Sequence, residues 1–75
     1  MNRVEILTTA IVANITQGKR TIAQLKSELA DGLAYVEYKG VNNVKKEFLI
    51  TITAIDRAIQ YFEIERAIAS RYRDN

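Results

Sequence analysis

The 75-residue sequence contains no proline, cysteine, histidine or tryptophan. Without cysteine or histidine it can form no zinc site of the usual kind, no disulfide and no thiol centre. The commonest acid–base residue of enzymes is also missing, so neither a Ser-His-Asp nor a Cys-His centre can be built. Its two serines, Ser27 and Ser70, lie outside any GxSxG, GxGxxG or GxxxxGK[ST] motif. We therefore expect a protein that is not an enzyme and that has no cofactor and no metal.

The charge is nearly balanced, with 11 Lys and Arg against 9 Asp and Glu. The basic residues occur in small groups with acids between them, whereas nucleic-acid modules concentrate positive charge on one face. The most apolar stretch, Phe48–Ile55, is far shorter than the ~20 residues that cross a bilayer, and no secretory signal is evident. The length suits a single domain over residues 1–75. We expect neither nucleic-acid binding nor membrane insertion, and an intracellular location.

The first segment predicts a helix over about residues 3–16. Asn2 and Glu5 form a start that resembles a capping box, and Gly18 ends the segment. Its apolar residues recur at helical spacing; they are Val4, Leu7, Ile11 and Ile15.

The second segment predicts a helix over about residues 21–39. Thr21 and Gln24 repeat the capping-box pattern, Gly40 ends the segment, and Gly32 inside it costs about 1 kcal/mol relative to alanine. One apolar face is expected along this helix; it consists of Ile22, Leu25, Leu29, Leu33 and Val36.

The third segment is apolar on two rows and predicts a long helix over about residues 43–72, capped by Asn42 or Asn43. One row consists of Val44, Phe48, Ile52, Ile55, Ile59 and Phe62. The other consists of Ile50, Ala54, Ala58, Tyr61, Ile64 and Ile68. The first row suits a helical hairpin with the second segment. The other row needs the first helix, another copy or another protein, and the short first helix would cover only part of it.

The expected fold is therefore all-α, a helical hairpin with a preceding N-terminal helix. An α+β alternative, helix–helix–hairpin–helix, rests on the alternating β-branched stretch Phe48–Thr53, with Leu33–Lys39 as its partner strand. The strand pattern explains about six residues, whereas the helical row continues through them without a break.

The chain resembles the small co-chaperones of the type III secretion needle subunit, the YscE-like family. The resemblance is carried by Gln24-Leu25-Lys26, by the connection Gly40–Asn43, by Ala54-Ile55-Asp56-Arg57-Ala58 and by the basic end Arg71-Tyr72-Arg73. Members are short cytoplasmic bacterial proteins built as a helical hairpin, often with a preceding helix. The resemblance implies binding to a larger helical-repeat chaperone, and a complex that keeps the needle subunit soluble until export.

Partner-binding residues are expected on the second row and on the first helix. They are Leu7, Ile11, Ile50, Tyr61, Ile64 and Ile68. Tyrosine is favoured at interfaces because it combines a large contact area with a polar tip. The alternative for each residue is ordinary core packing. Self-association of the chain when alone is a further expectation.

Two other functions fit parts of the sequence. Thr21-Ile22-Ala23-Gln24-Leu25 looks like the first helix of a helix-turn-helix DNA-binding regulator, but the stretch after Asp31-Gly32 lacks the outward polar residues of a recognition helix. A small phage head–tail joining protein would suit the α+β alternative.

Overall fold

The computed structural model describes residues 2–73 and shows three α-helices. They are α1 (Arg3–Thr16), α2 (Ile22–Lys39) and α3 (Lys46–Arg73), with a short 3₁₀ turn at Val41–Asn43 before α3. The expected all-α fold is confirmed. The α+β alternative is wrong, because both of its proposed strands lie inside helices and residues 2–73 contain no strand.

The β-branched stretch of α3 is helical, and its threonine hydroxyls find hydrogen-bond partners within the helix. The Thr51 hydroxyl donates to the carbonyl of Glu47 at 2.9 Å, and the Thr53 hydroxyl donates to that of Leu49 at 2.8 Å. Ile52 is meanwhile buried among the helices. Tertiary packing thus outweighs the strand preference of these residues.

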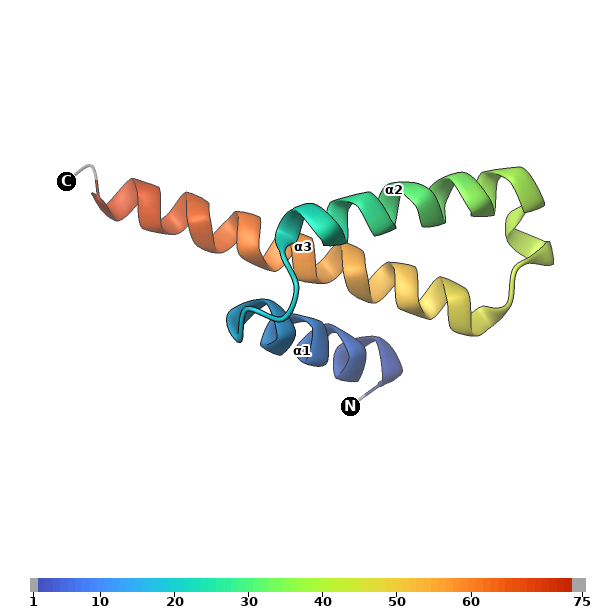
Figure 1. Ribbon diagram of the computed structural model, residues 1–75, viewed down its shortest axis with the longest axis horizontal. Helices are drawn as coiled ribbons and strands as arrows, with labels where there is room; N and C mark the ends of the chain where they lie inside the picture. Colours follow the sequence, from blue (N-terminus) through green and yellow to red (C-terminus); the bar gives the residue numbers. More distant parts are fainter. Residues whose placement is uncertain (1, 74–75) are drawn as a thin grey trace.

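Helix α3 is the axis of the molecule, and the other two helices pack on different sides of it (Figure 1). Helix α2 runs antiparallel to α3 as the second arm of a hairpin, whereas α1 runs in the same direction as α3. The buried core cluster lies where the three meet and consists of Ile11, Leu25, Ala54, Ile55, Ala58 and Ile59. The C-terminal part of α3 projects beyond both partners, which gives the molecule an elongated shape of 49 × 25 × 21 Å.

The ends of α1 and α2 follow the predicted capping residues. The Thr21 hydroxyl accepts from the N–H of Gln24 at 3.1 Å, and the Gln24 side chain accepts from the N–H of Thr21 at 2.9 Å, which completes a capping box. Asn2 caps α1 through its side-chain oxygen, which accepts from the N–H of Glu5. The connection after each helix includes a glycine at positive φ, +76° at Gly18 and +85° at Gly40.

The predicted cap of α3 is wrong. Asn43 lies in the 3₁₀ turn, and its side-chain amide donates to the carbonyl of Lys39 at 2.9 Å, so it closes the end of α2. Helix α3 begins three residues later, at Lys46, and the carbonyl of Lys45 accepts the first hydrogen bonds. A polar side chain between two helices can cap the C-terminus of the first or the N-terminus of the second. The geometry of the tight hairpin turn places that of Asn43 at the end of α2.

Gly32 marks a close approach of α2 and α3. It is buried, and a Cβ at this position would lie 2.9 Å from Cδ1 and 3.0 Å from Cγ1 of Ile52. A glycine inside a helix therefore has a packing reason here, because its missing side chain makes room for the isoleucine.

Substituting Gly32 by alanine should depend on what stands at position 52. Alanine gains about 1 kcal/mol of helix propensity, but in the natural background the new methyl group meets the Ile52 side chain. We expect Gly32→Ala to give no stabilisation alone and about 1 kcal/mol of stabilisation beside Ile52→Ala. Urea unfolding of the four proteins of this cycle measures the coupling. An equal effect of Gly32→Ala in both backgrounds would show that Ile52 does not restrict the space for a side chain at position 32.

Candidate partner-binding surface

The C-terminal part of α3 carries an uncovered apolar row that continues beyond α1 and α2. Tyr61, Ile64 and Ile68, here named the α3 row, are 50%, 60% and 51% exposed. Steps of three and four residues place them on one side of the helix. Singly exposed apolar side chains are ordinary, but three in line on a projecting helix form a continuous contact surface.

The exposure of the α3 row follows from the length of α1. Earlier in the same row, Ala54 and Ala58 are fully buried in the core cluster that Ile11 of α1 joins. Small residues at these two positions let α1 come close to α3. Beyond the end of α1 the row continues without a covering helix. This agrees with the expectation that the short first helix covers only part of the row.

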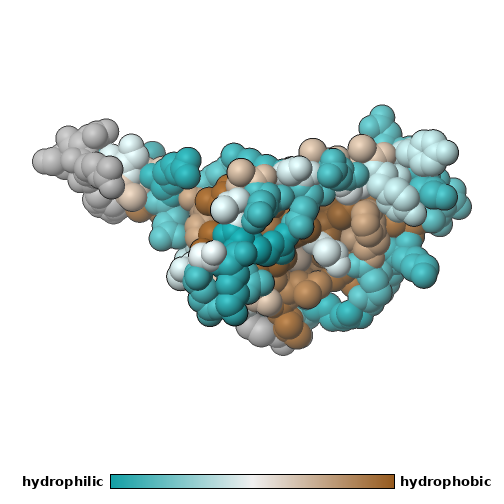
Figure 2. Space-filling view, in the orientation of Figure 1, coloured by the Kyte–Doolittle hydropathy of each residue, from teal (hydrophilic) through white to brown (hydrophobic). Residues whose placement is uncertain are grey.

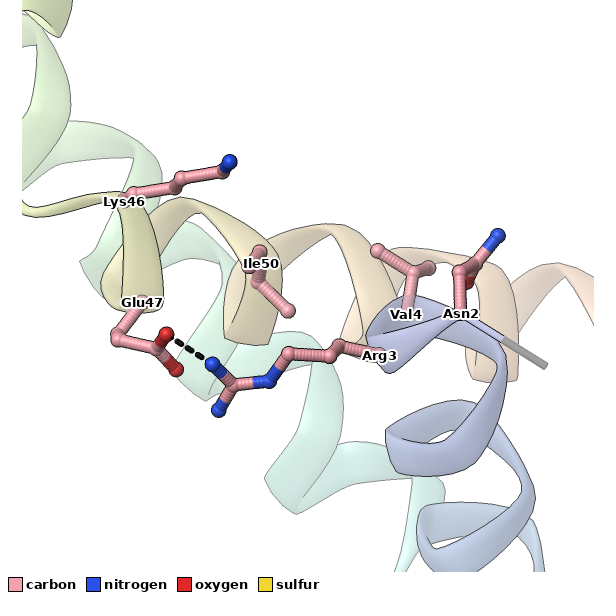
Figure 3. A pocket seen from close by; sticks show the side chains of 6 residues that line it. All are labelled: Asn2, Arg3, Val4, Lys46, Glu47 and Ile50. Atoms are coloured by element: carbon pink, nitrogen blue, oxygen red, sulfur yellow. Dashed lines mark hydrogen bonds and ion pairs between the residues drawn. The ribbon is translucent and has the colours of Figure 1, made fainter.

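The α3 row is the C-terminal part of a longer apolar row on α3, and this longer row begins beside the start of α1. Ile50 is half-buried and lines a cavity of about 380 Å³ together with the first residues of α1 (Figure 3). An ion pair between the Arg3 guanidinium and the Glu47 carboxylate spans this cavity and ties the two helix starts together. Both side chains are largely exposed, so the pair adds at most about 1 kcal/mol.

The six predicted partner-binding residues occupy two different environments. Ile11 is buried in the core, and Leu7 is half-buried against it. Tyr61, Ile64 and Ile68 are exposed together on the C-terminal part of α3, whereas Ile50 is half-buried beside the start of α1. The structure therefore separates residues that hold α1 on α3 from residues that are available to another molecule.

The residues at the start of the α3 row are held by contacts with neighbouring side chains and with α2. The ring of Tyr61 makes an edge-to-face contact with that of Phe62, with centroids 5.1 Å apart and planes at 84°. Phe62 is half-buried and lines a shallow depression with Ile22, at the start of α2. On the same side an ion pair at 3.4 Å joins Lys26 to Glu63. These contacts fix the point at which α3 leaves the three-helix region.

Leu33 lies at the edge of the predicted apolar face of α2 and is more exposed than the other leucines of this face. It is 53% exposed and stands at the rim of a groove of about 430 Å³ between α2 and α3, whereas Leu25 is fully buried. Leu33 lines this groove together with Asp56 and Ile59 of α3, so it lies at the solvent-exposed edge of the contact between α2 and α3.

A second group of exposed apolar residues lies outside the six predicted partner-binding residues. Tyr38 and Val41 are exposed at the hairpin end, and Tyr35 lies nearby in edge-to-face contact with Phe48 at 5.1 Å. The sequence indicates this group only through Tyr35 and Tyr38, which lie outside the main apolar row of the second segment.

The space-filling view shows how the two kinds of surface are distributed. On the face in Figure 2, hydrophobic residues gather in the middle, where the helices meet, and hydrophilic residues occupy much of the outline. Within residues 2–73, no helix is both long and apolar enough to cross a membrane. The same part of the chain contains no cluster of three acidic side chains suited to holding a metal ion.

Comparison with protein-family models, with curated proteins and with solved structures gives no match for this chain. What it does must therefore be inferred from its own fold and surface.

Proposed function

We propose that this protein is a helical co-chaperone of the type III secretion needle subunit. In this role it binds a larger helical-repeat chaperone and stabilises it, so that the needle subunit stays soluble before export. The observation that carries the proposal is the exposed α3 row on a helix that projects beyond its own bundle.

The physical requirements of such a complex suit this shape. A needle subunit that polymerises through apolar helix faces must have these faces covered in the cytosol. A helical-repeat protein has ends that need a cap. A hairpin whose long arm presents Tyr61, Ile64 and Ile68 at helical spacing offers a helix to a groove, which is a common mode of recognition.

The two competing functions lack a comparable feature. Helix α2 runs unbroken from Ile22 to Lys39, so there is no turn at Asp31-Gly32 to separate a first helix from a recognition helix. The head–tail joining protein depended on a strand pair, and both of its segments are helical.

The test is purification of the tagged chain from its native host, with mass spectrometry of the bound proteins. We expect a stoichiometric helical-repeat protein together with a small polymerising subunit. The double variant Ile64→Glu/Ile68→Glu should lose both while keeping its helical circular dichroism, because these exposed side chains contribute little to the fold.

The matched control is Ser70→Glu, which adds the same carboxylate to the same segment on the opposite side of the helix. It should retain the partners. Nucleic acid in the eluate, capsid or tail proteins in their place, or binding that survives Ile64→Glu/Ile68→Glu would contradict the proposal.

A further inference from the structure

Two arginines continue the α3 row at its two ends. Arg57, Tyr61, Ile64, Ile68 and Arg71 follow one another in steps of four, three, four and three residues. All five are exposed, and the spacing places them on one side of α3. At 1.5 Å per residue, the two arginines stand about 21 Å apart along the helix.

The arginines at the ends of the row are among the basic residues that have no ion-pair partner within residues 2–73. Arg3, Arg20 and Lys26 each form an ion pair with a glutamate. Arg57 and Arg71 form no ion pair with any of residues 2–73. Covering the row therefore removes water from two guanidinium groups that have no partner within the described chain.

Desolvating an unpaired guanidinium is costly, whereas a carboxylate that pairs with it makes a strong, charge-assisted hydrogen bond. An occupant with only apolar residues would leave this cost at both ends of the row. An occupant with a carboxylate near each end would offset it.

A second copy of the chain does not meet this requirement. Parallel pairing in register places each arginine against itself, and antiparallel pairing about Ile64 places Arg57 against Arg71. Both arrangements oppose like charges in a partly desolvated interface. Shifting the antiparallel register by about one turn relieves the repulsion but leaves only one kind of facing apolar pair, Ile64 with Ile68 for one direction of the shift and Tyr61 with Ile64 for the other.

Glu65 limits where the carboxylates of the partner can lie, because it is exposed beside the middle of the row. A carboxylate at the centre of the partner surface would be repelled by it, so acidic residues are suited to the two ends alone.

We propose that the α3 row docks into a groove of the partner that is apolar along its floor and carries a carboxylate at each end, about 21 Å apart. The inference rests on the proposed function, since it names the chemistry of the surface that the co-chaperone recognises. Charge sets the register of the helix in the groove, and the apolar side chains supply the contact area.

The test uses two synthetic helical hairpins as probes of this surface. Both present the same leucine-lined groove, and they differ only in having glutamate or lysine at the two ends. Titration calorimetry with the full chain should show at least about tenfold tighter binding of the glutamate hairpin at about 50 mM salt. The preference should shrink to below about threefold at 0.5 M salt, because exposed charge pairs are screened.

Charge reversal at both ends, Arg57→Glu/Arg71→Glu, should invert the preference. Arg66→Glu is the matched control, because it makes the same change in the same segment on another side of α3. Equal affinity for the two hairpins, binding of neither, self-association of the chain through the row, or an inversion caused by Arg66→Glu would overturn the inference.

The outcome separates the charge requirement from the docking role of the row. If both hairpins bind equally and Ile64→Glu/Ile68→Glu abolishes binding, the charge inference fails while the row remains a docking surface. If binding is indifferent to Ile64→Glu/Ile68→Glu, the row is not the docking surface and the proposed function fails with it.

Discussion

Replacing Leu25 by alanine is expected to destabilise the fold by about 2–5 kcal/mol. Leu25 is the one large side chain that is fully buried among the described residues, and it belongs to the core cluster shared with α1 and α3. Its truncation leaves a cavity where the three helices meet. A chain of this length has a total stability of roughly 4–11 kcal/mol, so the loss is a large share of it.

Thermal unfolding followed by circular dichroism should show a Tm lowered by at least about 10 °C. Leu33→Ala is the matched control, since it makes the same substitution in the same helix at a largely exposed position. Its expected effect is below about 1 kcal/mol. Similar losses from the two variants would mean that α2 does not pack on α3 through the face described above.

The second large effect is expected from Ile11→Asp, which places a carboxylate in the apolar contact between α1 and α3. Ile11 is buried with Ala54 and Ala58 in a cluster that offers no polar partner. An unpaired buried charge costs several kcal/mol. The chain escapes most of this cost by releasing α1 from α3, so the penalty is limited by the free energy of docking α1.

Hydrogen exchange should therefore report rapid exchange throughout α1 with partial protection retained in the α2–α3 hairpin. Ile6→Asp is the control, because Ile6 lies in the same helix and is exposed; it should leave the protection of α1 unchanged. If Ile11→Asp unfolds all three helices together, α1 is part of one cooperative unit with the hairpin. If it leaves α1 protected, the burial of Ile11 is not what holds this helix.

Helix positions could be predicted closely where the sequence contains capping residues at the start of a helix and a glycine after its end. The capping pairs at Asn2 and Thr21 and the glycines at 18 and 40 mark local events that need no distant partner. The start of α3 was predicted three residues too early, because Asn43 is an equally good local partner for the end of α2. The competition between these two roles is settled by the geometry of the turn.

The candidate surface was predictable only in part. Two apolar rows on one helix indicate that one of them exceeds what a single partner helix covers. The pattern does not say where along α3 the cover stops, so Ile11 and Ile64 were indistinguishable as candidates. Their burial differs because α1 ends beside the core and α3 continues. Leu33 illustrates the same limit, since its helical spacing does not show that it lies at the exposed edge of the contact between α2 and α3.

The sequence by itself determined the helical fold, the number of helices and the absence of histidine and cysteine chemistry, because periodicity, caps and composition are local properties of the chain. Only the tertiary structure decided which apolar residues remain exposed. That outcome depends on helix lengths, on the close contact at Gly32 and on the place where α1 stops covering α3. Each of these relates residues that are distant in sequence, so the uncovered row of Tyr61, Ile64 and Ile68 becomes visible only once the helices are packed.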